Sequence, residues 1–182
     1  MTLEIVQTGD PVLRTIARQL SLDEIRSEST QRLIAQMRDT MRAAPGVGLA
    51  APQIGESIQL AVIEDRIEYI ENVSAEQLEA RRREPIPFHV IINPKLTIAG
   101  EDTVDFFEGC LSVQGFAAIV PRGTSVLVDC LNERGEQIKL RGEGWYARIL
   151  QHEIDHLNGT LYIDHMQTRS FSTVENLERF GK

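Results

Sequence analysis

The chain has 182 residues, of which 42% are hydrophobic and 25% are charged, an ordinary balance for a folded globular protein. Its formal net charge of −8 excludes a sequence-independent nucleic-acid binder, because such a protein needs lysine and arginine to neutralise phosphates. One local basic cluster, at residues 81–83, does not alter that balance. This length suffices for one well-formed core and is marginal for two.

Signals for a membrane or for secretion are not found in this sequence. No apolar run approaches 18 residues, and residues 1–4 do not begin a signal peptide. The two cysteines, Cys110 and Cys130, are too few for a disulfide framework, which indicates a reducing compartment. We therefore expect an intracellular protein without a membrane partner, in the bacterial cytoplasm rather than as the mature form of an organellar protein.

Helix signals dominate the first quarter of the chain. Asp10 before Pro11 has the form of an N-cap followed by a first helical residue. Ser21 and Glu24 have the spacing of a capping box. Apolar residues then recur at helical spacing, which predicts an amphipathic helix over residues 28–44, with its methionines as core filler.

A glycine-rich loop follows, reading GVGLAAPQIG at residues 46–55. Its glycines and proline predict special backbone angles and a close approach of the backbone to another group. A phosphate-binding loop is not favoured, because lysine is absent and neither phosphate-loop spacing is met. Gln53 is the one polar side chain in its middle, either a structural hydrogen-bonder or a positioned donor.

The rest of the chain predicts a mixture of strands and helices. The expected elements are strands at 60–63 and 89–94, a short helix or mobile excursion at 74–80, a hairpin of strands 124–131 and 137–140, and a helix at 145–158. His89 is expected to be structural, Cys130 to be packed in its strand, and His165 to be solvated in a polar tail. Since repeats and linkers are absent, we predict one compact α+β domain over residues 1–182, with antiparallel or mixed sheets around a buried C-terminal metal-binding helix.

That last helix carries the strongest chemical signal, QHEIDHL at residues 151–157. His152 and His156 lie about 40° apart around a helix, so both can reach one metal ion. Glu153 falls on the same side, where it can meet a metal-bound water. The competing interpretation is a solvated helix that has this spacing by chance, but two histidines and a glutamate beside an apolar stripe would be costly to bury unpaired. Gly159 is the expected C-cap position.

A third ligand must come from elsewhere in the chain. Cys110, in EGCLS at residues 108–112, follows a glycine that lets the backbone bend toward a site. Its thiolate with the two histidines would make a three-ligand site with an open fourth position, the pattern of catalytic metal centres.

Together, the three stretches resemble the motifs of the peptide deformylase family. The matching residues are GVGLAAPQ at 46–53, EGCLS at 108–112 and QHEIDHL at 151–157, in the same order and at similar separations. The resemblance covers most of the chain. Each motif alone is suggestive, and three in order are specific.

The resemblance implies hydrolytic removal of the N-formyl group from the initiator methionine of nascent chains, with release of formate. Its substrates would be N-formylmethionyl peptides. It also implies one divalent metal ion, usually ferrous iron, with zinc or nickel able to occupy the site. By matched position, the ligands would be Cys110, His152 and His156.

The resemblance assigns the remaining catalytic roles as well. Glu153 would take a proton from water and pass it to the leaving amine, while the metal ion lowers the pKa of the water that it binds. Gln53 and the backbone N–H of Leu111 would donate to the tetrahedral oxyanion. Deleting one such donor from a comparable site raises the activation free energy by roughly 2.7–4 kcal/mol. Asp155 and Arg122 are expected to pair, either to steady the site or as a surface ion pair.

An apolar pocket for the methionine side chain is a further implication. The expected substrate-binding residues are Gly46, Val47, Gly48, Phe106, Gly109, Trp145 and Ile149. Trp145 and Ile149 are four residues apart on the metal-binding helix, so they can share a wall. Core packing is an equal alternative for Trp145.

Some positions depart from the commonest bacterial pattern. Ala117 stands where many family members carry arginine, so no side-chain cation is expected at that rim. Residues 144–148 and 168–176 resemble the branch that includes plant and animal organellar deformylases. The tail after His165 lacks a long basic helix of the kind that docks some relatives on the ribosome. The ribosome, near its exit tunnel, is still an expected partner, but the sequence does not indicate how the chain would bind it.

Two other functions compete with deformylation. A metallopeptidase shares the His-Glu-x-x-His pattern but usually draws its third ligand from a downstream Glu or His, and here only His165, Glu175 and Glu178 follow, at unpromising spacing. A non-catalytic, metal-stabilised binding module would lose its metal only on unfolding.

Overall fold

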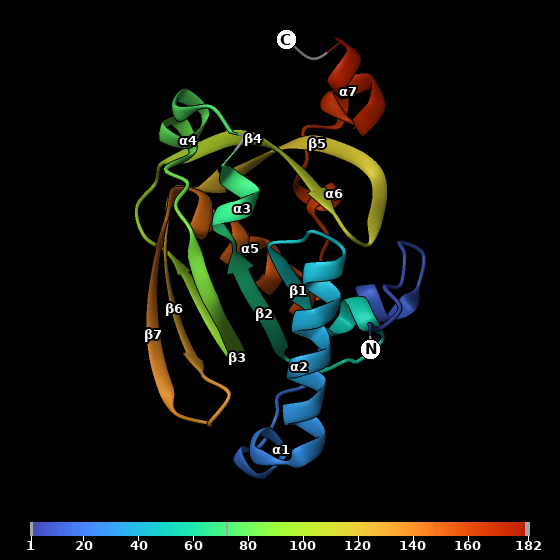
Figure 1. Cartoon of the computed structure of the whole chain (residues 1–182), viewed down its shortest axis with the longest axis vertical. Coiled ribbons are helices and arrows are strands. Elements are labelled where there is room, and N and C mark those ends of the chain that lie inside the picture. Colours follow the sequence, from blue (N-terminus) through green and yellow to red (C-terminus); the bar gives the residue numbers. More distant parts are fainter. Residues whose placement is uncertain (1, 72, 181–182) are drawn as a thin grey trace.

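One helix near the C-terminal end, α5 (Gly144–Leu157), lies between two antiparallel sheets (Figure 1). The computed structural model describes residues 2–71 and 73–180. The strands are β1 (Gly48–Ala50), β2 (Leu60–Asp65), β3 (Ile86–Ile98), β4 (Thr103–Cys110), β5 (Val113–Gly123), β6 (Ser125–Leu131), β7 (Gln137–Glu143) and β8 (Ser172–Thr173). One sheet has the order β1-β2-β3-β6-β7 and the other β4-β5-β8.

The other helices surround this frame. They are the 3₁₀ helices η1 (Pro11–Arg14), η2 (Ala51–Ile54) and η3 (Thr168–Ser170), and the α-helices α1 (Leu22–Arg26), α2 (Glu28–Ala43), α3 (Ile67–Ile70), α4 (Ala75–Arg81), α6 (Tyr162–His165) and α7 (Val174–Phe180). No helix within the described ranges is both long and apolar enough to cross a membrane. The predicted α+β domain with antiparallel sheets is confirmed.

The five-stranded sheet is buried on both faces at β2, where all six residues are buried. Leu60 and Val62 pack in one apolar cluster with Met37 of α2. Ile63, on the opposite face, packs in a second cluster with Leu150 of α5. Because successive side chains of a strand point to opposite faces, β2 joins α2 and α5 into one core.

Local sequence signals placed most helix boundaries correctly. The capping box of Ser21 and Glu24 opens α1, and the helix predicted at residues 28–44 is α2. Asp10 caps a 3₁₀ turn rather than an α-helix, with its side chain accepting from the N–H of Val12. Gly159 has φ +71°, the left-handed backbone expected just after a helix end.

Three parts of the chain differ from the predictions. The glycine-rich stretch 46–55, expected as a loop, contains β1 and η2, and of its glycines only Gly55 has a positive φ, +83°. The long β4–β5 hairpin was not predicted, because charged Glu108 and Arg122 are buried in it and break the apolar alternation of a typical strand. His165 lies in the short helix α6 rather than in an irregular tail. Its side chain is 44% exposed, which agrees with the expected solvation, and its Nε2 lies 3.3 Å from Oδ2 of Asp155.

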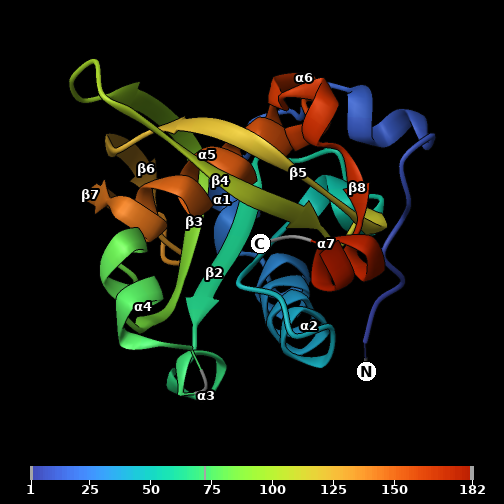
Figure 2. The same cartoon turned by 90° about the horizontal axis from the view of Figure 1, so that it is seen from above.

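The charge-rich segment between β2 and β3, residues 66–85, folds into α3 and α4. Seen from above, α4 lies on the side of the molecule where α5 begins, and α7 lies near α2 and β5 (Figure 2). His89 on β3 is structural, as predicted: its Nε2 is 2.9 Å from the hydroxyl of Tyr146 and its Nδ1 is 2.9 Å from the carbonyl oxygen of Pro87.

Candidate active site

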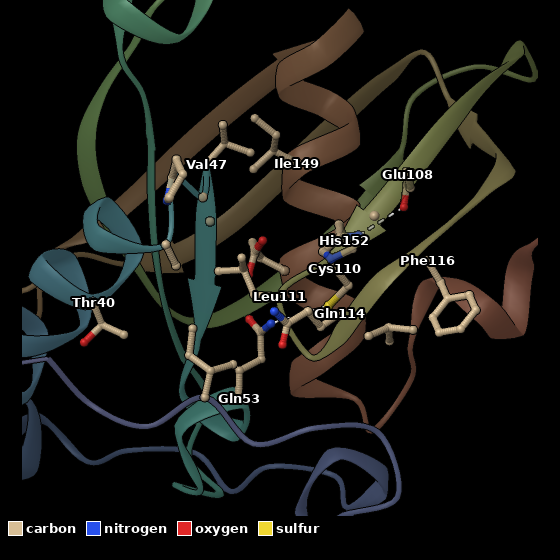
Figure 3. Close-up of a pocket in the computed structure, with 18 of the residues that line it drawn as sticks. Thr40, Val47, Gln53, Glu108, Cys110, Leu111, Gln114, Phe116, Ile149 and His152 are labelled. Carbon is tan, nitrogen blue, oxygen red and sulfur yellow. Dashed lines mark hydrogen bonds and ion pairs between the residues drawn. The ribbon is translucent and has the colours of Figure 1, made fainter. Parts of the chain in front are cut away.

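Helix α5 and the end of β4 bring a cysteine and two histidines together. Ligand atoms of Cys110, His152 and His156 all lie within 4.8 Å of one another. Sγ of Cys110 is 3.3 Å from Nε2 of His156, and the two imidazole rings are 5.0 Å apart between centroids. Figure 3 shows Cys110 and His152 side by side at the pocket.

The local backbone explains how Cys110 reaches the helix. The β4–β5 register shifts between Gly109 and Cys110, so the strand bends where the cysteine begins the turn. Two donors then face its sulfur: Nε2 of Gln53 at 3.5 Å and the backbone N–H of Ser112 at 3.4 Å. A thiolate is the form of cysteine that binds metals.

This donor set fits a divalent transition-metal ion. A thiolate and two imidazoles are ligands that zinc and iron accept, and three protein ligands leave a position open. His156 is buried, and burial lowers the pKa of its imidazole well below the usual value, which favours the neutral form that a metal needs. Among the described residues, its Nδ1 has no hydrogen-bond partner.

His152 is oriented by a buried carboxylate that the sequence analysis did not assign. Oε2 of Glu108 lies 3.0 Å from Nδ1 of His152, which leaves Nε2 for the cysteine side of the ring. Burial opposes the imidazolium charge, but hydrogen bonds with Cys110 and Glu108 outweigh it and hold the pKa of His152 well above its usual value. A carboxylate behind a histidine ligand fixes the tautomer and orientation of its ring.

Glu108 is itself held by two buried arginines. Arg122 donates to both of its carboxylate oxygens at 3.0 and 3.1 Å, and Arg148 donates to Oε1 at 2.6 Å. Although burial opposes ionisation, hydrogen bonds from His152 and Arg122 hold the pKa of Glu108 well below its usual range. The predicted pair of Arg122 and Asp155 is present at 2.5 Å. Arg122 therefore links Asp155 to the carboxylate behind His152.

We expect Glu108→Gln to weaken metal affinity about 10–100-fold, because the amide cannot replace the carboxylate behind His152. Asp105→Asn on the same strand is the matched control, since Asp105 is exposed and accepts a hydrogen bond from Gln167 rather than from a histidine. Competition with a chromogenic chelator measures both affinities. Equal affinity in the two variants would show that Glu108 does not orient the ligand.

Glu153 is buried beside the ligand group. Its Oε2 has no hydrogen-bond partner within the described part of the chain. Burial raises the pKa of Glu153 to about 7; the positive charge of His152 opposes this shift, and the negative charge of Glu108 adds to it. A cation bound by the neighbouring ligands would lower this pKa again. The carboxyl group can thus hold or release a proton near neutral pH.

The glycine-rich loop makes room for this carboxyl group. A Cβ atom at Gly48 on β1 would lie 2.1 Å from Oε1 of Glu153. No real contact is that short, so a larger residue at position 48 would displace Glu153 or the strand.

Gly48→Ala should therefore lower the free energy of unfolding by about 1–3 kcal/mol and reduce turnover through a displaced Glu153. Gly109→Ala is the steric control, because a Cβ there meets only the carbonyl oxygen of Phe116, at 3.6 Å. Thermal unfolding of the two variants compares their stabilities. If the Gly48 variant is as stable as the Gly109 variant, Gly48 and Glu153 are not in close contact.

A cavity of about 770 Å³ opens onto this group. All but two of the predicted site residues line it: Gly46, Val47, Gly48, Gln53, Gly109, Cys110, Leu111, Trp145, Ile149, His152 and Glu153. Val47 and Ile149 face each other at one end, and Phe116 stands at the opposite end (Figure 3). Trp145 lines the cavity and also packs against the apolar cluster that contains Leu150 of α5. Core packing and a place at the pocket, the two alternatives for this residue, are therefore compatible.

The two exceptions have different causes. His156 is not among the lining residues, and its Nε2 lies within hydrogen-bond distance of Sγ of Cys110. Phe106 was expected in the pocket, but its ring lies 4.9 Å from the guanidinium of Arg81 and 5.3 Å from that of Arg148. The neighbouring Phe107 lines the cavity, and Phe106 instead packs against these two arginine side chains.

Comparison with known proteins identifies the family to which this cysteine–histidine site belongs. The family model described as polypeptide deformylase matches residues 2–172. The chain belongs to the peptide deformylase family. Within the described residues, no downstream histidine or glutamate joins the ligand group, so the metallopeptidase alternative is not favoured.

Individual deformylases resemble the chain over nearly its whole length. It is 52% identical over 175 residues to the chloroplastic peptide deformylase 1A of Solanum lycopersicum, and 48% identical over 175 residues to the chloroplastic/mitochondrial peptide deformylase 1A of Arabidopsis thaliana. Each match covers 96% of this chain, which spans 63% and 65% of those two relatives. A class I type b peptide deformylase from Acinetobacter baumannii, solved with Met-Ala-Ser bound, has a TM-score of 0.80 at 30% identity, covering 91% of this chain and 99% of that one.

Proposed function

We propose that the chain is a metal-dependent hydrolase that removes the N-formyl group from the N-terminal formylmethionine of newly synthesised polypeptides and releases formate. The observation that carries the proposal is the Cys110, His152 and His156 group at a cavity that Glu153 also lines, with a carboxyl oxygen that has no partner among residues 2–71 and 73–180. Membership of the deformylase family supports it. So does the Acinetobacter baumannii relative, whose structure holds the peptide Met-Ala-Ser.

One divalent ion would be held by Cys110, His152 and His156, and we propose ferrous iron, with zinc or nickel as substitutes. When bound, the ion would lower the pKa of water toward neutrality. Glu153 takes the proton of the attacking water and gives it to the departing amine nitrogen, a role for which its burial beside the ligand group places it. Glu108 keeps the His152 ring in place throughout.

Donors from two other elements serve the developing oxyanion. Gln53 is buried on η2, and its Oε1 accepts from the N–H of Ala50 at 2.9 Å, which fixes the amide with its Nε2 toward Cys110. Leu111 lines the cavity directly after Cys110, so its backbone N–H is the second proposed donor. A neutral amide donates without adding a charge that needs its own partner.

The methionine side chain would enter the apolar end of the cavity. We propose Val47, Trp145 and Ile149 as its walls, with the backbone of Gly46, Gly48 and Gly109 beside the peptide. Glycine at those three positions lets the substrate main chain come close.

Gln53→Leu should lower kcat by about 10²–10³-fold with unchanged metal content, because it removes a donor that acts on the oxyanion. Steady-state kinetics on a formyl-Met peptide, with metal analysis of the same sample, provide the measurement. A rise in KM alone would make Gln53 a ground-state binder instead.

We further propose that the chain works in the bacterial cytoplasm as one domain over residues 1–182 and meets its substrates near the ribosomal exit tunnel. Co-sedimentation of the protein with translating and empty ribosomes tests the last point. Binding to neither would remove the ribosome as a partner and leave free formyl peptides as substrates.

Metal removal tests the proposed function against a metal-stabilised binding module. Protein purified anaerobically, analysed for metal and then treated with a chelator should remain folded by circular dichroism and lose formate release from formyl-Met-Ala-Ser. Adding back ferrous iron, nickel or zinc should restore activity and rank the ions. Loss of the fold together with the metal would favour the binding module.

A further inference from the structure

The segment between β2 and β3 ends against the start of α5. Gly144, the first residue of α5, has φ +55°, and a Cβ atom there would lie 2.6 Å from the carbonyl oxygen of Arg81 and 2.6 Å from Cβ of Arg82. Only glycine permits this contact with a left-handed backbone. The end of segment 66–85 is therefore fixed directly beside Trp145.

Two arginines of this segment face the indole of Trp145. The guanidinium of Arg81 is 5.1 Å from its ring and that of Arg83 is 4.9 Å away. Tryptophan is the best aromatic partner for a cation. Arg81 also lies 4.9 Å from the ring of Phe106, so its guanidinium is placed between two aromatic side chains.

Arg83 is anchored independently of Trp145, whereas Arg81 is held by its contacts with the two aromatic rings. Arg83 makes two hydrogen bonds, of 2.7 and 2.9 Å, to the fully buried carboxylate of Asp65 at the end of β2. Arg81 is half-buried; burial and the charge of Arg83 lower its pKa. Two like charges this close need a compensating partner, which Asp65 and the indole provide.

Trp145 connects this cluster to the cavity, because it lines the cavity together with Val47 and Ile149. We propose that Arg81 and Arg83 are positioning residues that hold Trp145 as a fixed wall of the pocket, so that segment 66–85 sets its selectivity for the unbranched methionine side chain. The selectivity part rests on the proposed function. A fixed indole keeps the pocket narrow, whereas a mobile one admits wider side chains and holds methionine less well.

Trp145 is the one tryptophan of the chain, so intrinsic fluorescence reports on it alone. Arg81→Met keeps the length of the side chain and removes its charge. We expect acrylamide quenching of Trp145 to rise, and the preference in kcat/KM for formyl-Met-Ala-Ser over formyl-Phe-Ala-Ser to fall about 10-fold, mainly through KM for the methionine peptide. Arg81→Lys keeps a cation over the ring and should retain most of the preference.

Arg66→Met is the matched control, because Arg66 lies in the same segment and makes a cation–π contact, 5.8 Å from the ring of Tyr69. It should change neither quenching nor substrate preference. If Arg81→Met does not fold, Arg81→Gln carries the same expectations, since it keeps a planar polar head without charge.

An unchanged preference and unchanged quenching in the Arg81 variant would overturn the inference. A loss of kcat/KM shared equally by both peptides would also overturn it, because that result indicates a purely structural role. If the wild type released no formate from either peptide, the proposed function would fail instead. The quenching comparison would then decide alone whether Arg81 holds Trp145.

Discussion

Replacing Glu153 with alanine should lower kcat about 10²–10⁴-fold while metal content and fold stay unchanged, since general acid–base catalysis contributes an effect of this size. Glu153 is buried beside His152, and its Oε2 has no partner among the described residues, so no structural bond is lost with it. Its carboxyl group is the buried acid of the cavity with a pKa near neutrality.

The measurement is steady-state kinetics on a formyl-Met peptide, with metal analysis and thermal unfolding of the same preparation. Glu153→Gln is the isosteric companion, because it keeps the volume beside Gly48 and removes only the titrating group. Wild-type turnover in either variant with stoichiometric metal would remove Glu153 as the acid–base.

Cys110→Ala should abolish stoichiometric metal binding, whereas Cys130→Ala should keep it. Cys110 lies with two imidazoles and two hydrogen-bond donors around its sulfur. Cys130 is buried in β6, and burial, with a smaller contribution from Asp129, raises the pKa of its thiol to about 11. Its thiolate is therefore scarce at neutral pH, and it should resist alkylation in the native protein.

Both variants should be prepared identically and analysed for metal and activity. Cys110, partly open at the cavity, should also be the more readily oxidised of the two in the wild type. Loss of metal in the Cys130 variant, with normal occupancy in the Cys110 variant, would overturn the ligand set.

The features that the sequence predicted correctly depend on short-range patterns. Helix caps, the amphipathic α2 and the spacing of His152, Glu153 and His156 are all properties of residues within one or two turns. Cys110 was predicted as the third ligand from the glycine before it and from the resemblance of three motifs. Spacing along the chain alone does not show which distant residue joins the two histidines.

The features that were missed depend on which strands pair and which faces they present. Glu108 is buried because Arg122 of β5 and Arg148 of α5 reach it, and those contacts are set by the β4–β5 register. Phe106 and Phe107 are chemically identical, so residue type alone does not show that Phe107 rather than Phe106 lines the cavity. The spacing of Glu108 and Cys110 along one strand was the signal that could have revealed the carboxylate behind His152.

Product analysis of the metal-reconstituted wild-type protein tests the central claim most directly. Formate and free α-amine should be followed together, by enzymatic formate detection and amine derivatisation, with formyl-Met-Ala-Ser as substrate. Deformylation predicts equal amounts of the two products, an intact Met-Ala-Ser peptide, and no reaction with the same peptide lacking the formyl group. Cleavage of an internal peptide bond, or no formate at stoichiometric metal, would contradict it.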